Sequence, residues 1–366
     1  MGKKITIQDI AEELGVSRNT VSKAINNGSG IADATRERIL RKAVEMGYKQ
    51  FSYLNTVSSI SAPREPDGAA KEIALLTTVF LNHSHFASVM LDSFQQEISL
   101  LGYTMNTHRI REEHLATRSL PATFHREHAA AILCIEVFDR PYAEMICSLG
   151  LPVLFVDAPV CDGDFLPADQ LYMENASGII KLVRDLIQTG KRRIGFIGNY
   201  MHCQSFFERY AAFRCAMRLS GVPVEETDCL KCDGYDEIRE KLRDMRSLPE
   251  VFLCANDFVA MDALRVLREM GKTVPDDIWL CGFDDSPESR MMTPPLTTIH
   301  IHTQIMTFSA VHLLMSRIKE PNLDYRAIHT QTELIWREST GNIKLNINNI
   351  NNINNKINAE KPEENA

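Results

Sequence analysis

Short apolar runs alternate with longer amphipathic segments between residues 71 and 340. The apolar runs are typical of buried strands, whereas the amphipathic segments repeat with the 3.6-residue period of a helix. We expect strands at residues 73–81, 130–135, 153–156, 194–197, 251–255 and 278–281. We expect helices at residues 86–101, 142–149, 176–187, 206–219, 238–245 and 259–270. This order predicts βαβ units with mainly parallel sheets, and about 270 residues of it favour two α/β lobes over one sheet.

Glycine follows several of the expected helices, as it does at helix C-caps. These glycines are Gly102, Gly150, Gly190, Gly221 and Gly271. In open parallel sheets, ligands bind beyond the carboxyl ends of the strands. We therefore expect a small molecule to bind in a cleft between the two lobes.

The first 50 residues have a different, wholly helical pattern. Thr6 can cap a first helix, Gly15 can supply a tight turn, and Ser17 can cap a second helix that runs to about Asn26. The inner apolar positions of these helices and of a third one after residues 33–35 are Ile7, Ile10, Ala11, Leu14, Val21, Ala24, Ile25, Ile39, Leu40, Ala43 and Met46. Two short helices joined by a glycine turn predict a helix-turn-helix.

This helical segment is basic, although the chain as a whole is acidic. Residues 1–50 contain nine Lys and Arg against six Asp and Glu, whereas the whole chain has a net charge of −8. This charge distribution excludes a protein whose whole surface is basic and binds nucleic acid. It favours a small polyanion-binding domain attached to an acidic body. A plain three-helix bundle with a solvated polar face is the alternative.

The outer face of the second expected helix carries side chains that can read DNA. Arg and Lys bind guanine in the major groove, Asn binds adenine, and short hydroxyl side chains suit phosphates. The expected DNA contacts are Thr6, Ser17, Arg18, Asn19, Thr20, Ser22, Lys23 and Asn26.

Residues 7–11 and 15–26 together resemble the DNA-binding signature of the lactose-repressor/galactose-repressor (LacI/GalR) family of bacterial transcription regulators. Further similar motifs are Glu208-Arg209, Ala255-Asn256-Asp257, Gly282-Phe283-Asp284-Asp285, Pro295-Leu296-Thr297-Thr298-Ile299 and Trp336-Arg337-Glu338-Ser339-Thr340. The resemblance covers about residues 5–340. It implies a two-lobed effector domain like the periplasmic sugar-binding proteins. It also implies that Arg18, Asn19 and Lys23 read bases, with Tyr48 as a further DNA contact.

Two segments depart from the family pattern. Residues 49–57 lack the usual hinge-helix sequence, and Val57 stands where the family has a leucine that inserts into the minor groove. The sequence leaves open whether a hinge helix reads the minor groove here. Ile301 occupies a position that often supplies a polar ligand contact. This change implies an effector that is less polyhydroxylated than a sugar, or one that is bound in another pose.

Arg209 and Asp257 are the strongest candidates for effector contacts, because each lies within a family-like motif. Further candidates are Asn256, Glu174, Asn175, Asp157 and Phe86. Structural alternatives exist, since Arg209 could be a surface residue and Asp257 could be a helix N-cap. We assign Asp284 and Asp285 to a hinge between the lobes rather than to the ligand.

These features predict an N-terminal all-α helix-turn-helix domain on an α/β two-lobed effector domain. The expected parts are a DNA-binding domain at 1–48, a hinge or linker at 49–70, an effector-binding and dimerisation domain at 71–340 and a low-complexity tail at 341–366 that we expect to be disordered. The isoleucine spacing of the tail also permits a small oligomerisation helix, and a tetramer is the alternative to a dimer. The identity of the effector, the operator sequence and the choice between induction and co-repression are left open.

We expect a cytoplasmic homodimer that binds a palindromic operator and a sugar-like effector, as a repressor of carbohydrate-related genes. The nine cysteines are scattered, and no secretion signal or membrane-spanning run is found. We expect no cofactor and no metal, since the His pairs lack further ligands at suitable spacing. No motif predicts an enzyme. A transporter's solute-binding protein is a weaker alternative, because it would not carry a basic head.

Overall fold

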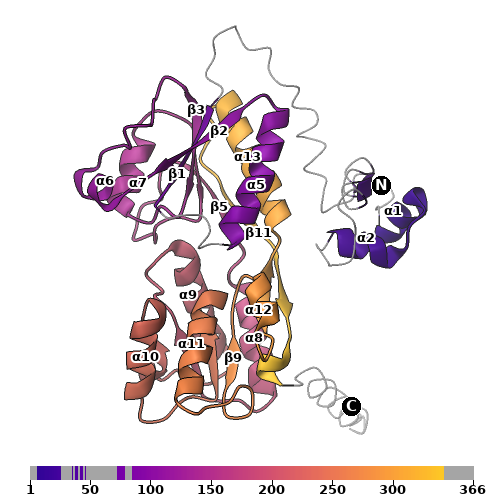
Figure 1. Cartoon of the computed structure of the whole chain (residues 1–366), viewed down its shortest axis with the longest axis vertical. Coiled ribbons are helices and arrows are strands. Elements are labelled where there is room, and N and C mark those ends of the chain that lie inside the picture. The colour runs from indigo at the N-terminus through magenta and orange to yellow at the C-terminus, as the bar shows by residue number, and fades with distance from the viewer. Residues whose placement is uncertain are drawn as a thin grey trace, which may run out of the picture.

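The computed structural model describes residues 6–25, 35, 38–39, 42–43, 46, 72–78 and 85–341. Residues 85–341 and the strand at 72–77 form two α/β lobes, one above the other in Figure 1. Each lobe has a parallel sheet with helices on its faces. Among the described residues, no helix is long and apolar enough to cross a membrane.

The first lobe contains a six-stranded sheet in the order β11-β5-β4-β3-β1-β2, and all its neighbouring strands are parallel. Its strands are β1 (Glu72–Thr77), β2 (Thr104–Arg109), β3 (Ala129–Ile135), β4 (Val153–Val156), β5 (Asp169–Met173) and β11 (Ala327–Thr330). Its helices are α5 (His85–Leu100), α6 (Glu112–Thr117), α7 (Arg140–Cys147) and α13 (Thr303–Lys319). Alternate residues of β1 enter different cores, with Ile73 and Leu75 on one face and Ala74 and Leu76 on the other.

The second lobe contains a four-stranded parallel sheet in the order β7-β6-β8-β9. Its strands are β6 (Ile194–Ile197), β7 (Cys229–Leu230), β8 (Val251–Cys254) and β9 (Trp279–Cys281). Its helices are α8 (Ser177–Gln188), α9 (Gln204–Leu219), α10 (Gly234–Asp244), α11 (Asp257–Glu269) and α12 (Pro287–Met291), with short 3-10 turns at Glu226–Asp228 and Glu338–Thr340.

The chain crosses between the lobes three times. It leaves the first lobe after β5, returns after β10 (Thr298–Ile301) into α13, and leaves again after β11 into β12 (Thr332–Ile335). Strands β10 and β12 pair antiparallel, and α13 packs against α5 in the first lobe. One apolar core runs through both lobes, since residues such as Leu75, Phe94, Phe196 and Phe213 belong to the same buried cluster.

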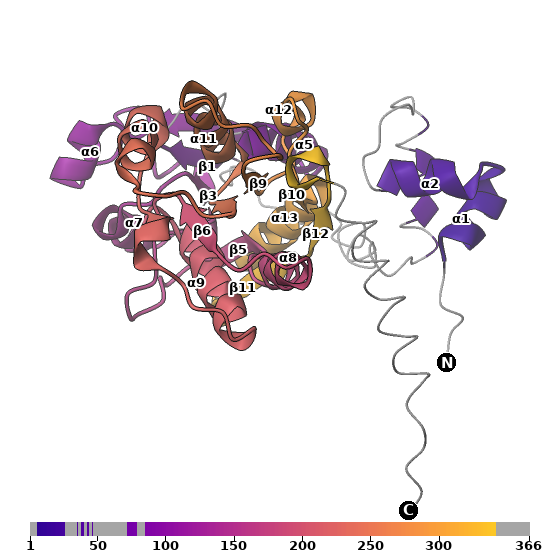
Figure 2. The same ribbon diagram turned by 90° about the horizontal axis from the view of Figure 1, so that it is seen from below.

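The head has the expected local structure where it is described. Helices α1 (Ile7–Leu14) and α2 (Arg18–Ile25) are joined at Gly15, which has a φ of 63°. Thr6 and Asp9 form a capping box, and Ser17 accepts a hydrogen bond from the Thr20 amide at 3.0 Å. The head has a small core of its own, and Phe308 of α13 packs against it; Figure 2 shows both helices beside the lobes. Its buried residues are Ile10, Ala11, Val21, Ala24, Ile39 and Ala43.

Most expected elements are confirmed, with ends that lie within four residues of the predicted ones, and the five expected C-cap glycines have positive φ. One strand was predicted too long, because β1 ends at Thr77 rather than at residue 81. The sequence pattern did not indicate β2, β5, β7, β10, β11, β12, α6, α12 or α13. Strand β2 lies at the sheet edge with four exposed side chains, so it lacks an apolar run.

Candidate functional site

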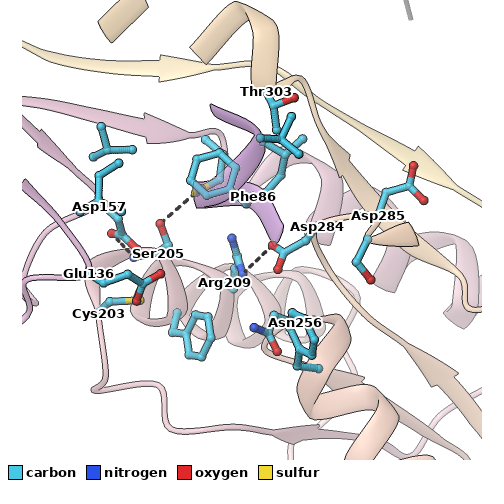
Figure 3. A pocket seen from close by; sticks show the side chains of 18 of the residues that line it. Phe86, Glu136, Asp157, Cys203, Ser205, Arg209, Asn256, Asp284, Asp285 and Thr303 are labelled. Carbon is cyan, nitrogen blue, oxygen red and sulfur yellow. Dashed lines mark hydrogen bonds and ion pairs between the residues drawn. The ribbon is translucent and has the colours of Figure 1, made fainter. Parts of the chain in front are cut away.

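A cavity of about 310 Å³ lies between the two lobes, where the carboxyl ends of their parallel strands meet. Glu136 follows β3, Asp157 follows β4, and Asp284 lies just beyond β9. The first turns of α9 contribute Ser205, Arg209 and their neighbours (Figure 3). The cavity volume lies at the lower end of the range of small-molecule sites, about 300–1,000 Å³.

The acidic residues at these strand ends have an unusual backbone conformation. Glu136, Asp157, Asp284 and Asp285 have φ values of 58°, 59°, 117° and 57°. Within the described residues, they are four of the five non-glycine residues with positive φ. Such conformations cost free energy and cluster at functional sites. Here they bring four carboxylates to the cavity wall.

Arg209 is held rigidly at the centre of the cavity wall, with only 2% of its surface exposed. Its Nε donates to Asn175 Oδ1 at 2.9 Å, and one terminal nitrogen donates to the Ala255 carbonyl at 2.8 Å. The same nitrogen lies 3.6 Å from a carboxylate oxygen of Asp284. The guanidinium also stacks 3.6 Å above the Phe283 ring. Its position is therefore fixed by the protein and does not depend on a ligand.

Asp157 faces Arg209 from the first lobe. One of its carboxylate oxygens accepts hydrogen bonds from the amides of Ala158 at 2.9 Å and Ser205 at 3.1 Å. Burial raises the pKa of Asp157, while hydrogen bonds from Cys203 and these amides and the Arg209 charge oppose the shift. The Ser205 contact links the first lobe to α9 at the cavity.

Asp284 and Asp285 are adjacent in the chain but have opposite electrostatic environments. Burial raises the pKa of Asp284, and the Arg209 charge only partly offsets this. Burial acts in the same direction on Asp285, but hydrogen bonds from His300, Arg290 and Arg337 outweigh it and hold its pKa well below the usual range. Asp285 is therefore an ion-pairing residue, whereas Asp284 presents a poorly compensated carboxyl group to the cavity.

The structure divides the predicted effector residues into two groups. Phe86, Asp157, Arg209 and Asn256 line the cavity, and Asn256 also caps α11 by accepting a hydrogen bond from the Val259 amide at 2.9 Å. Asp257, Glu174 and Asn175 are outside the lining.

The residues outside the lining have structural contacts instead. Asp257 is fully buried and accepts hydrogen bonds from Thr298 Oγ1 at 2.6 Å and the Ser286 amide at 2.8 Å. Glu174 accepts hydrogen bonds from the first amides of α8, and Asn175 orients Arg209. Asp257 therefore lies behind the cavity wall, and its direct contact with an effector stays a prediction.

The sequence interpretation missed several lining residues. Asp284 was assigned to a hinge, although it lines the cavity, and Glu136 was not selected at all. Both follow buried strands, which is the signal that could have found them. Aromatic lining from Phe138, Phe206 and Phe258 was also missed, since no pattern separates these residues from core phenylalanines.

Comparison with known proteins assigns both parts of the chain. Residues 6–50 match the family of bacterial regulatory proteins, lacI family, and residues 183–340 match the periplasmic binding protein-like domain. The HTH-type transcriptional regulator CelR of Thermobifida fusca is 27% identical over 348 residues, covering 92% of this chain and 98% of CelR. The chain combines a LacI-family helix-turn-helix domain with a periplasmic-binding-protein-like domain.

Other relatives match this chain to a comparable degree. The HTH-type transcriptional repressor PurR of Actinobacillus pleuropneumoniae serotype 3 is 28% identical and covers 92% of this chain and 99% of PurR. A solved transcriptional regulator CelR–cellobiose complex has a TM-score of 0.66 and 26% identity, covering 92% of this chain and all of that one. The lac repressor dimer bound to operator has a TM-score of 0.64 at 22% identity, covering 92% and 99% of the two chains, and supports the fold. The predicted resemblance and fold class are confirmed.

The predicted DNA-reading face lies on the outside of the LacI-family head. Arg18, Asn19 and Lys23 of α2 are exposed, on the side opposite Val21 and Ala24. Ser17 and Thr6 are helix caps, and Thr20 and Ser22 are partly exposed. Asn26 and Tyr48, like Val57 and the tail, lie outside the described residues.

A second polar link joins the Arg209 region to the crossover strand β11. Glu208 accepts a hydrogen bond from Asn175 at 2.8 Å, and its other oxygen lies 3.7 Å from His329 Nε2. The His329 ring stacks on Tyr172 with centroids 5.0 Å apart. The hydrogen bond with Glu208 raises the pKa of His329, because the carboxylate stabilises the imidazolium.

The raised pKa of His329 gives a stability contribution that depends on pH. A group whose folded-state pKa is raised stabilises the fold below its unfolded pKa of about 6.5, and this contribution is lost as pH rises through the folded value. We expect His329→Gln to reduce the free energy of unfolding more at pH 6 than at pH 8.5, by less than about 1 kcal/mol for this half-exposed pair. Urea titrations at both pH values measure it, with His125→Gln as the exposed control. An equal loss at both pH values would contradict the pairing.

Proposed function

We propose that this protein is an effector-responsive transcriptional repressor of carbohydrate-related genes. The observation that carries the proposal is one chain with an exposed basic helix-turn-helix face and a ligand-sized cavity between two lobes. The relatives are regulators and repressors, and the CelR relative has been solved with cellobiose. By this similarity the effector is a sugar or a sugar derivative.

The proposed parts of the chain follow the predicted boundaries. Residues 1–48 bind DNA, residues 49–70 link the head to the body, residues 71–340 bind effector and dimerise, and residues 341–366 are a low-complexity tail. A homodimer suits a palindromic operator, because one recognition helix reads only one half-site. In this proposal the protein acts in the cytoplasm.

The switch in this proposal is a change in the angle between lobes. Ligand in the cavity contacts Phe86 and Asp157 of the first lobe together with Arg209 and Asn256 of the second. A ligand shifts a conformational equilibrium only by its differential affinity for the two states. Contacts to both lobes favour the closed state and so change the position of the two heads in the dimer.

Operator binding tests the DNA-binding half of the proposal. We expect the wild-type protein to select a palindromic site from fragments of its source genome. Arg18→Ala and Lys23→Ala should each lose about 1–3 kcal/mol of operator affinity and relax the base preference at one position. Lys181→Ala, a matched loss of charge on the exposed face of α8, should have no such effect. Unchanged affinity of Arg18→Ala for operator and for random DNA would contradict the recognition-helix assignment.

A further inference from the structure

Two adjacent residues of α9 face different cavities. Arg209 lines the cavity of about 310 Å³ between the lobes. Glu208 lines a second cavity of about 70 Å³, together with Tyr172 and His329 of the first lobe. Successive residues of a helix point about 100° apart, so this division follows from the helix itself. The side chain of Asn175 contacts both Glu208 and Arg209 and so connects the two cavities.

The hydrogen-bonding capacity of these three side chains determines which way the Asn175 amide is turned. An arginine side chain can only donate, an ionised glutamate can only accept, and an asparagine amide does both. Accordingly, Asn175 Nδ2 donates to Glu208 Oε2 at 2.8 Å, and Asn175 Oδ1 accepts from Arg209 Nε at 2.9 Å. The reversed amide would place donor against donor at Arg209 and acceptor against acceptor at Glu208.

Glu208 is kept ionised and in place by its neighbours. Burial alone would raise its pKa, but hydrogen bonds from His329, Gln204 and Asn175 outweigh burial and hold the pKa below the usual range. Gln204 Nε2 donates to Glu208 Oε1 at 3.0 Å, and His329 Nε2 lies 3.7 Å from the same oxygen. Near neutral pH, Glu208 is therefore an acceptor only, as the orientation of the Asn175 amide requires.

We propose that Glu208 is a positioning residue of the effector site, which sets the orientation of the Asn175 amide and thereby directs Arg209 into the cavity. The inference rests on the proposed function, since it adds to the effector site a residue that does not line its cavity. Asn175 anchors Nε of Arg209, and the Ala255 carbonyl anchors one terminal nitrogen. Two anchored nitrogens fix the plane of the guanidinium group and so the direction of its third nitrogen. A group that is already oriented loses little entropy when it binds a ligand.

The hydrogen bond of the Arg209 Nε–H tests the proposal in the unliganded, full-length protein. Nitrogen-15 NMR spectra of protein with labelled arginine resolve such signals, and the Arg209→Lys variant identifies the Arg209 signal by its absence. We expect this proton to exchange with water about three- to tenfold faster in Glu208→Gln, whose amide can present either a donor or an acceptor to Asn175. Exchange should be faster still in Glu208→Met, which keeps the length of the side chain but has no oxygen.

A second arginine of α9 provides a matched control. Arg214 lies 2.7 Å from Glu226 in an exposed ion pair on the same helix. Glu226→Gln makes the same chemical change as Glu208→Gln. It should alter the Arg214 signals and leave the exchange of the Arg209 proton at the wild-type rate, whereas Glu208→Gln should do the reverse.

The outcomes separate a positioning role from a structural one. Wild-type exchange of the Arg209 proton in Glu208→Gln and Glu208→Met would overturn the proposal. So would a Glu208→Gln protein that melts at a lower temperature but keeps the wild-type exchange, because Glu208 would then only stabilise the fold. Glu208→Gln keeps the shape of the side chain and decides the result if Glu208→Met does not fold. Operator selection by the head is measured separately, so its failure would refute the proposed regulator without changing this result.

Discussion

Replacing Asp257 with alanine should reduce the free energy of unfolding by about 2–5 kcal/mol, because two buried donors lose their acceptor. Both carboxylate oxygens are used, one by Thr298 Oγ1 and the other by the Ser286 amide. These donors belong to β10 and to the turn before α12, so the side chain joins α11 to two other parts of the second lobe. The surroundings are tightly packed, since a Cβ at Gly282 would lie 2.2 Å from Asp257 Oδ1.

Urea unfolding of the Asp257→Ala variant measures this loss. The exposed Asp276→Ala removes the same group from the protein surface and should be nearly neutral. Asp257→Asn keeps the shape and one acceptor, so its loss should lie between those of the two alanine variants. If Asp257→Ala is as stable as wild type but loses its response to sugar, the carboxylate contacts the effector after all.

Arg209→Ala should weaken effector binding by about ten- to a hundredfold, because a charged hydrogen-bond partner contributes about 1.5–3 kcal/mol. The guanidinium is already aligned by Asn175, the Ala255 carbonyl and the Phe283 ring, so binding a ligand costs it little conformational entropy. Its loss also leaves Asp284 without its ion-pair partner. The pKa of that carboxyl group should therefore rise further.

Thermal shifts measure this effect with any sugar that stabilises the wild-type protein. The variant should show a much smaller shift than wild type at the same sugar concentration. Arg218→Ala, an exposed change on the same helix, should respond normally. Circular dichroism confirms folding, and Arg209→Lys provides a second variant that keeps the charge. A folded Arg209→Ala protein with a wild-type shift would exclude Arg209 from the site.

The sequence predicts those parts of the fold whose burial is simple. Residues 153–156 and 194–197 are short apolar runs buried on both faces, and they form β4 and β6 with the expected bounds. Strand β5 begins with Asp169, whose carboxylate is paired with Arg317 and Arg326, so its burial depends on partners about 150 residues away. Helix α13 has apolar residues on most of its faces and therefore lacks the one-sided stripe of a surface helix.

Prediction of individual residues at the candidate site is limited for the same reason. Asn256 and Asp257 are adjacent and were both predicted to contact ligand, but the first lines the cavity and the second is buried behind it. Which of two neighbours faces a cavity depends on the direction in which the chain leaves β8, and residue types alone do not specify this. Arg209 was selected because of its motif. Its partner Asp284 was assigned to a hinge because the motif alone does not give its backbone angle.

The three crossings between the lobes also determine when the protein can fold during synthesis. Strand β11 completes the first sheet, and α13 packs against α5, although both lie more than 200 residues beyond β1. Domains usually fold from the N-terminus as they leave the ribosome, at about 5–20 residues per second. Here the first lobe must wait for nearly the entire chain. A truncation before Ala327 would thus remove an edge strand of the lobe that was translated first, and neither lobe can be isolated as one continuous segment.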